Sequence, residues 1–172
     1  MANTTFGEIV RKVMLKCKNA DGVTRLMAEE AVNDSCKVIA AVKDFDELMV
    51  IDTTSADTVD GTKRYHIETN FSLTRPKDIY SILVEDTDNS RRLRYLTPKD
   101  YDTQFPYPEG QSEGKPRFYT QRGRYIDFYP IPDAAYDLHI QYSQWPATLT
   151  ADSTEIAFTN IDYVIVQLAA DM

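Results

Sequence analysis

The chain has two histidines, His66 and His139, which are the first candidates for acid–base catalysis or metal binding. Each lies in a segment that alternates like a strand, and neither belongs to an H-x-x-x-H or H-x-E spacing. A zinc site or a general base needs partner groups brought to one place, which such spacings provide. The sequence also lacks a P-loop and a G-x-G-x-x-G motif. We therefore expect structural or surface roles for both histidines and predict no catalytic residue.

Acidic side chains are the next candidates, because carboxylates bind hard cations and act in hydrolases. Asp86, Asp88 and Asn89 are close in sequence, but a calcium loop also needs a central Gly and a closing bidentate Glu. Arg91-Arg92 follow instead. With 27 acidic residues in the chain, neighbouring carboxylates arise by chance. A hydrolase would need a pair facing across a cleft, and nothing in the sequence indicates one. We predict neither a metal nor a cofactor.

Aromatic side chains concentrate in the last third of the chain and allow two interpretations. The residues concerned are Tyr119, Tyr125, Tyr129, Tyr136, Tyr142 and Trp145. They could form a platform that stacks on sugars, or they could be core residues and cross-strand pairs that stabilise a sheet. Exposure of Tyr125, Tyr129 and Tyr142 together would favour carbohydrate binding, whereas their burial would favour a structural role.

Basic residues form three local clusters beside expected turns, although the chain has a net charge of -8. The clusters are Lys63-Arg64, Arg91-Arg92-Arg94 and Arg122-Gly123-Arg124. The acidic balance argues against a dedicated nucleic-acid binder, which needs concentrated Lys and Arg to neutralise phosphates. Solvated turn tips are the simplest interpretation, and contacts with acidic surfaces of neighbouring subunits are a second, since such charges set register. A weak nucleic-acid contact is a third.

The elements that carry these residues are predicted from apolar periodicity. Strand-like alternation begins at Asp46, and the predicted strands are 46–53, 65–69, 79–85 and 91–96. Asp60-Gly61 indicates a hairpin between the first two. Thr97-Pro98 begins a short helix near 98–105, with Thr as cap and Pro at the first helical position.

Residues 114–149 predict a three-stranded antiparallel unit. Its strands are Phe118–Gln121, Tyr125–Tyr129 and Asp137–Tyr142, turned at Arg122-Gly123 and again across Pro130–Asp133.

Both ends of the chain have helical spacing. Phe6, Ile9, Val10, Val13, Met14 and Cys17 form one stripe, and Thr5 with Glu8 fits a capping box. A second helix is predicted over 24–42, with the stripe Leu26, Met27, Ala31, Val38, Ile39 and Val42. A third begins at Ile161, with the stripe Ile161, Val164, Ile165 and Leu168. We interpret Cys17 and Cys36 as small buried apolar residues, while a disulfide between the helices would need an oxidising compartment.

Together these segments predict an α+β fold, with helices at both ends of the chain and strands in the middle. The predicted domains are 1–45 with 151–172, and 46–150.

The first residues lack the apolar core of a signal peptide, and no run of about 18 apolar residues suggests a membrane helix, so we expect synthesis in a cytoplasm. The last helix lacks a stop signal, so either the natural chain continues or the helix end packs on a partner; an intact native mass of 19.7 kDa would exclude the former.

An ordered set of motifs over residues 97–150 carries a family resemblance. It comprises Thr97-Pro98-x-Asp100-Tyr101, Gly114-Lys115-Pro116-x-Phe118-Tyr119, Gly123, Tyr129-Pro130-Ile131-Pro132-Asp133, Tyr142 and Trp145-Pro146 ahead of Leu149. A turn and helix, a G-x-P at the start of a strand, a glycine hairpin and a P-x-P-D turn follow in that order. This region, with its flanking helices, resembles the head-to-tail adaptor (neck or connector) proteins of tailed bacteriophages.

The resemblance implies a fold in which the N- and C-terminal helices form a small bundle, with an antiparallel β-domain of two hairpin units inserted between them. It also implies a non-enzymatic virion protein that forms a ring, twelve copies being the expected number, beneath the portal. Such a ring extends the DNA channel and offers a platform to the tail, nozzle or other neck proteins below, with DNA only as passing cargo and no membrane partner. The family often carries an extended C-terminal segment that reaches the portal; in this protein such a segment is either absent or lies beyond Met172. The localisation implied is the phage neck, after synthesis in the host cytoplasm.

The candidate contact residues fall into two groups. The turn tips are Gly61, Asn89, Arg91, Arg92, Arg122, Gly123, Arg124, Pro130, Pro132 and Asp133. The ring-forming helices are represented by Phe6, Ile9, Val13, Ile161, Val164 and Leu168. The alternative function is a β-sandwich carbohydrate-binding module of a phage tail or secreted enzyme, and a hydrolase with converging acidic groups is a third.

Overall fold

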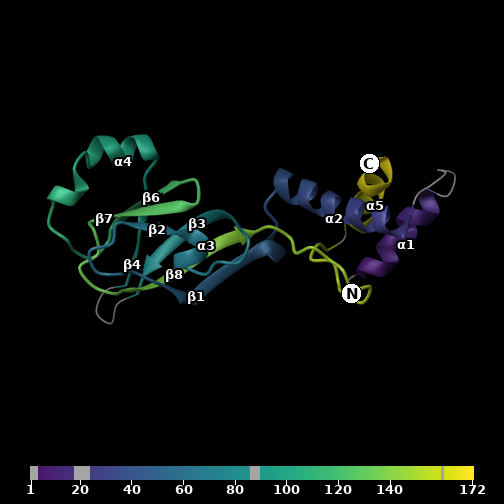
Figure 1. Ribbon diagram of the computed structural model, residues 1–172, viewed down its shortest axis with the longest axis horizontal. Coiled ribbons are helices and arrows are strands. Elements are labelled where there is room, and N and C mark those ends of the chain that lie inside the picture. The colour runs from purple at the N-terminus through teal and green to yellow at the C-terminus, as the bar shows by residue number, and fades with distance from the viewer. Residues whose placement is uncertain (1–3, 18–23, 86–89, 160) are drawn as a thin grey trace. The chain divides into compact units, whose positions relative to one another are not determined.

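The computed structural model describes residues 4–17, 24–85, 90–159 and 161–172, apart from the side chain of Ser55 (Figure 1). It has the predicted α+β class. The chain separates into two compact units. The first, here called the helical bundle, comprises Met1–Leu48 and Trp145–Met172, and the second, the β unit, comprises Met49–Gln144. The predicted division into domains 1–45 with 151–172 and 46–150 stays a prediction.

Three helices form the bundle: α1 (Phe6–Lys16), α2 (Arg25–Val42) and α5 (Asp162–Asp171), with a short 3-10 turn, η1 (Asp46–Leu48). Thr5 and Glu8 make the predicted capping box at the start of α1. The backbone of residues 4–7 also bonds to the segment before α5, with Phe6 N donating to Thr154 O at 2.8 Å. These links join the two ends of the chain in one core.

The predicted apolar stripe of α2 is wrong in most positions. Leu26, Met27, Val38 and Val42 are exposed, and of the predicted stripe Ile39 is buried. The helix packs instead through a narrow face of mostly small side chains, Ala28, Val32, Asn33, Ser35, Cys36, Ile39 and Ala40. The polar members of this face are satisfied: Asn33 exchanges hydrogen bonds with the Leu149 backbone at 2.8 and 3.0 Å, and Ser35 donates to Ala31 O. Large apolar residues therefore did not mark the buried face.

The β unit contains two four-stranded sheets, ordered β1-β8-β3-β4 and β2-β7-β6-β5. Their bounds are β1 Met49–Asp57, β2 Arg64–His66, β3 Pro76–Val84, β4 Arg91–Arg92, β5 Arg94–Tyr95, β6 Phe118–Arg122, β7 Tyr125–Tyr129 and β8 Asp137–Gln144. The helical turns are α3 Ile67–Asn70, α4 Pro98–Gln104 and η2 Pro108–Gly110. Inward side chains from both sheets, such as Ile140 and Phe128, share one apolar core. Among the described residues, the strand pairings are antiparallel except that of β5 with β6, which is parallel.

The three-stranded unit predicted over 114–149 does not form. β6 and β7 pair as a hairpin, but β8 lies between β1 and β3 in the other sheet. Pro130–Asp133 therefore carries the chain from one sheet to the other. The same correction applies to Asp60-Gly61, because β1 and β2 also belong to different sheets. Alternation identifies the buried face of a strand but not its partner.

The strand predicted over 65–69 ends early. After β2, Ile67–Asn70 form the helical turn α3. The His66 side chain accepts from Thr69 N at 3.2 Å, and Asn70 Oδ1 accepts from His66 N at 2.7 Å. Such local side-chain bonds to the backbone compete with strand pairing.

Candidate contact surfaces

The β6–β7 hairpin presents Gly123 and Arg124 at its tip. Arg122 and Tyr125 are the last paired residues, and Gly123 has a φ of +62° with no atom near its missing side chain. Glycine at the first central position suits a two-residue hairpin turn. Arg124 is exposed and pairs with Glu68 at 3.0 Å. This tip is an accessible predicted contact site.

Arg122, predicted as part of the same tip, is instead held inside the β unit. Its guanidinium binds Asp102 of α4 and lies 3.3 Å from Asp127 Oδ2. Asp127 is 1% exposed and also receives two hydrogen bonds from Arg64, at 2.6 and 2.8 Å. Arg122 lowers the pKa of Asp102 through their hydrogen bond. The predicted basic cluster is therefore largely neutralised, and it fastens α4 to the sheet.

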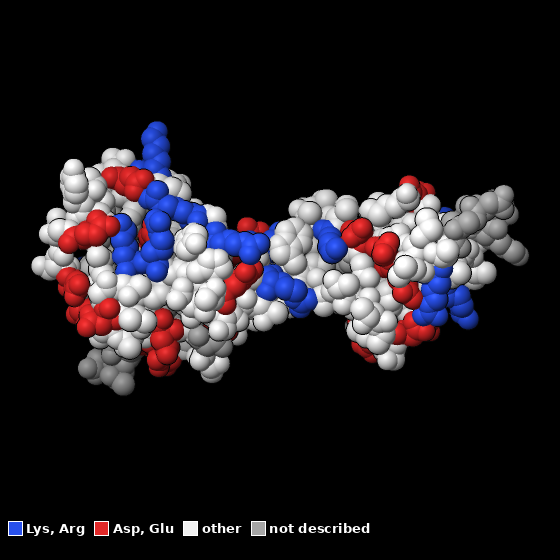
Figure 2. Space-filling view, viewed as in Figure 1, with Lys and Arg blue, Asp and Glu red and all other residues white. Residues whose placement is uncertain are grey.

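Charge pairing extends over this part of the β unit. Lys63 binds Glu109 at 2.7 Å. Tyr101 of α4 donates its hydroxyl to Phe128 O at 2.9 Å, and burial raises its pKa. On the visible face of the β unit, Figure 2 shows Lys and Arg side chains gathered in a band across its upper part, with Asp and Glu mainly along the outer and lower edges.

Two predicted tips, Gly61 and the Pro130–Asp133 turn, meet each other. Gly61 has a φ of +69°, and its N–H donates to Pro132 O at 2.8 Å. Pro132 is buried and Pro130 half-buried, so neither is the exposed contact that the sequence predicts. Asp133 is exposed and accepts from Tyr136 Oη. Gly61 and Asp133 thus form one composite tip, with the two prolines as its support.

The remaining basic tip lies on an edge strand. Arg91 and Arg92 form β4, are exposed, and pair with β3 at Val84 and Leu83. Asn89 lies outside the described residues, as do Asp86 and Asp88.

The residues that represent the predicted ring helix α1 are buried, and a role of α1 and α5 in a ring stays a prediction. Phe6, Ile9 and Val13 are at most 1% exposed and form the core of the bundle. In α5, Ile161 and Leu168 are partly buried against that core, and Val164 is exposed. The surfaces that these helices offer to other molecules are therefore made by different side chains.

Large apolar side chains do lie on the outside of the bundle. They are Met14, Leu15, Leu26, Met27, Val38, Val42, Tyr163, Val164 and Met172. Periodicity analysis assigned several of them to the core because they are apolar. Where such side chains adjoin one another on the surface, they are typical of a protein contact.

The tyrosines do not assemble into the platform that a sugar-binding module would need. Tyr125 is exposed, but Tyr142 is 3% exposed and lies in the other sheet, where its hydroxyl accepts from Thr74 N. Tyr129 is half-buried and stacks on Phe105, with ring centroids 3.6 Å apart. The arrangement is that of core and cross-strand packing.

In the described part of the chain, the histidine and cysteine side chains that could act in catalysis or metal binding do not form a catalytic or metal-binding arrangement. His139 lies 2.7 Å from Glu85, and Cys17 and Cys36 are free thiols. Sequence reasoning missed a G-x-S-x-G spacing at Gly110–Gly114. It begins at the last residue of η2 and continues into irregular chain, not between a strand and a helix as a nucleophile elbow requires. Among the described residues, no three acidic, His or Cys side chains gather as metal ligands, and no helix is suited to span a membrane.

Comparison with known proteins gives one finding. A family model described as SU10 adaptor protein matches residues 4–171, which includes parts of both units. No curated protein matches the chain significantly.

Proposed function

The chain belongs to the SU10 adaptor protein family, and from this we propose that it is a structural head-to-tail adaptor in the neck of a tailed phage. An adaptor of this family is a phage structural protein and a virion component, which points away from enzymatic activity. The finer proposal is a ring of identical copies, twelve being the expected number, beneath the portal.

The family match carries this proposal because it spans nearly the whole chain. The exposed apolar side chains of the helical bundle support it, since a ring needs an intersubunit surface on every copy. Head-to-tail contacts that close by rotation generate such a ring. The proposed neighbours are the portal above and tail, nozzle or other neck proteins below.

DNA is proposed only as cargo that passes through the ring. A conduit must not grip its cargo, and a net charge of -8 disfavours attachment to phosphates. The Arg64–Asp127–Arg122 pairing supports the same view, since it gives two basic side chains of the β unit an acidic partner within the chain. The Gly123–Arg124 tip and the Gly61–Asp133 tip are proposed contacts with neighbours or tail.

The test is to mix the purified chain with its portal and record native mass and negative-stain images. A ring of adaptor copies on the portal is expected. A monomer in the absence of the portal is compatible with the proposal, since such rings can require the portal as a template. Monomers both with and without the portal would contradict it.

A further inference from the structure

A groove of about 440 Å³ lies on the helical bundle, where the end of α1, the start of α2 and the end of α5 meet. Its floor is made of small or short apolar side chains, including Val13, Ala28, Ala31 and Ala169. Three of these are no more than 5% exposed, and Ala31 is half-buried. Such a floor leaves room above it for one large apolar side chain.

The rim of this groove is acidic. Glu30 and Asp34 lie one helical turn apart on α2, and both are exposed. Glu30 has no ion-pair partner among the residues that the structure describes. Asp34 pairs with Lys37 at 2.9 Å, but both side chains are more than half exposed. Exposed pairs of this kind are weak, so both carboxylates are available to another cation.

The outer face of α1 has the complementary character. Leu15 is 63% exposed, and Arg11 and Lys12 precede it by four and three residues, so the three side chains form one ridge. Arg11 and Lys12 are exposed and have no ion-pair partner within the described ranges. Glu8 continues the strip, but its carboxylate accepts from Thr5 N in the capping box. The free part of the ridge is therefore an apolar side chain flanked by two cations.

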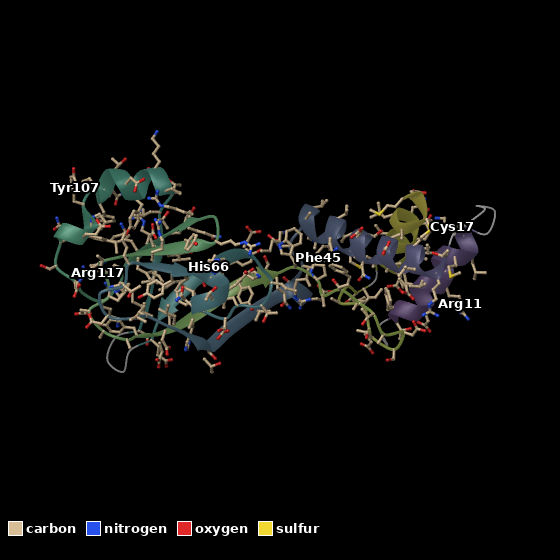
Figure 3. The ribbon with its side chains drawn as sticks, in the orientation of Figure 1. Arg11, Cys17, Phe45, His66, Tyr107 and Arg117 are labelled. Atoms are coloured by element: carbon tan, nitrogen blue, oxygen red, sulfur yellow. The ribbon has the colours of Figure 1, made fainter. Side chains whose placement is uncertain are left out.

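The ridge and the groove face opposite sides of α1. Leu15 lies two residues from both Val13 and Cys17, which line the groove, and two residues turn an α-helix by about 200°. Arg11 and Cys17 can be located on α1 in Figure 3. The two complementary surfaces therefore cannot meet within one chain. Opposed, complementary faces produce head-to-tail contacts between copies, whereas a shared face would produce a two-fold dimer.

We infer that the ridge of one copy docks in the groove of the next, with Leu15 on the apolar floor and Arg11 and Lys12 facing Glu30 and Asp34. The occupant of the groove is thus a second copy of this chain. This inference rests on the proposed ring and names the contact that closes it.

A charge-reversal set tests the pairing in the full chain, with assembly on the portal followed by native mass and imaging. Arg11→Glu with Lys12→Glu should raise the protein concentration for half-maximal assembly about tenfold or more. Glu30→Lys with Asp34→Lys should do the same. Combining all four changes should restore assembly, because each charge again faces its opposite. Circular dichroism melts check that these exposed changes leave the fold intact.

Three results would overturn the contact. The first is that the wild type forms rings and that either charge reversal leaves their assembly unchanged. The second is that the variant with all four changes assembles as weakly as the two double variants. The third is a charge reversal that weakens attachment to the portal while the rings remain closed. That result would mean that the groove binds the portal and not a second copy of the chain. A wild type that never forms rings would remove the proposed function as well, so the two failures are distinguishable.

A cross-linking experiment tests the same contact by asking whether two thiols of neighbouring copies lie close together. Leu15→Cys places a thiol on the ridge, and the native Cys17 lies in the groove. A short bis-maleimide should join them between copies and give a ladder of dimers and larger species on a denaturing gel. Leu15→Cys with Cys17→Ser is the control and should give no ladder. Assembled rings of Leu15→Cys that yield no ladder would overturn the contact.

Discussion

In the helical bundle, large apolar side chains such as Leu15, Val42 and Tyr163 are 63%, 84% and 77% exposed. In the β unit, several of the large exposed side chains are tyrosines, including Tyr95 and Tyr107, whose hydroxyls can remain hydrated. The β unit also exposes Ile51 and Val59, but among the described residues the bundle exposes more large aliphatic side chains. The bundle leaves part of its apolar surface for another molecule to cover.

The charges differ in part. In the β unit several cations pair with acidic side chains, as in Arg64–Asp127 at 2.6 Å and Lys63–Glu109 at 2.7 Å, although Arg91 and Arg92 are exposed on β4; in the bundle Arg25 and Lys37 are also paired. On the bundle, Arg11 and Lys12 have no such partner among the described residues. The comparison teaches that a scaffold and an assembly surface can be separated within one chain. A buried core and satisfied charges suit the scaffold, while unpaired charge and exposed apolar surface suit assembly.

The largest expected effect comes from emptying the core of one unit. Phe128 is fully buried among aromatic neighbours in the β unit, and Phe128→Ala should cost about 3–5 kcal/mol of unfolding free energy. If the two units fold independently, hydrogen exchange should accelerate in the β unit while α1, α2 and α5 keep their protection. Hydrogen exchange measured by mass spectrometry, peptide by peptide, resolves this.

The matched variant is Phe6→Ala, because Phe6 is equally buried in the bundle. It should accelerate exchange in the three helices and leave the β unit protected. Loss of protection throughout the chain in both variants would show one cooperative unit and remove the separation.

A smaller effect is expected from the buried carboxylate. Asp127→Ala leaves Arg64 and Arg122 without their shared anion, and removing one partner of a buried ion pair costs about 3–5 kcal/mol. Both arginines are partly exposed and can rehydrate, so we expect about 2–3 kcal/mol, measured by urea unfolding. The control is Asp102→Ala, whose carboxylate is largely exposed and which should cost less than about 1 kcal/mol. Equal losses in the two variants would contradict the structural role of Asp127.

The features that sequence predicts well are set by a few neighbouring residues. The capping box of Thr5 with Glu8, the helix start at Thr97-Pro98 and the glycine turn at Gly123 all formed as expected. Each depends on hydrogen bonds between neighbouring residues or on the φ of one residue. Such features can be deduced from the residue types and their spacing in the sequence.

Features that depend on distant residues could not be predicted in this way. The partner of β8 is chosen by the packing of two sheets, not by the turn before it. On α2, burial of Asn33 is stabilised by Leu149, more than a hundred residues away, while Val42 stays exposed. The contact surfaces were misassigned for the same reason: apolarity alone does not distinguish a core residue such as Phe6 from an assembly residue such as Leu15.

Gly7 provides a third test, of how tightly the N-terminal residues of the bundle pack against the segment before α5. A Cβ at Gly7 would lie 2.9 Å from Asp152 Cβ and 3.3 Å from its Cα, and Gly7 N donates to Asp152 O at 3.1 Å. Alanine favours a helix by about 1 kcal/mol over glycine, but crowding of a packed site costs about 1–3 kcal/mol. We expect Gly7→Ala to lower the free energy of unfolding by about 1 kcal/mol in urea denaturation. Gly110→Ala meets no atom within 4 Å and should change it by less than about 0.5 kcal/mol.

The smallest effect is an alkaline loss of stability from one thiol of the bundle. Burial raises the pKa of Cys36 from 9.0 to about 11. Between those two values the unfolded chain releases a proton that the folded chain retains, so stability is unaffected below pH 9 and falls as pH rises toward 11. The loss should reach about 1 kcal/mol at pH 10. Urea unfolding at pH 8 and pH 10 measures it as a difference between wild type and Cys36→Ala.

That difference isolates the thiol from the tyrosines of the β unit. Burial also raises the pKa of Tyr65 and of Tyr119, so the β unit loses stability in alkali by the same mechanism. Those losses occur equally in wild type and in Cys36→Ala, and they cancel in the comparison. Cys17→Ala is the matched control and should retain the alkaline loss, because Cys36 is unchanged in it. An alkaline loss that persists undiminished in Cys36→Ala would mean that the helices bury no titrating thiol, and that the pH sensitivity of the chain belongs to the β unit alone.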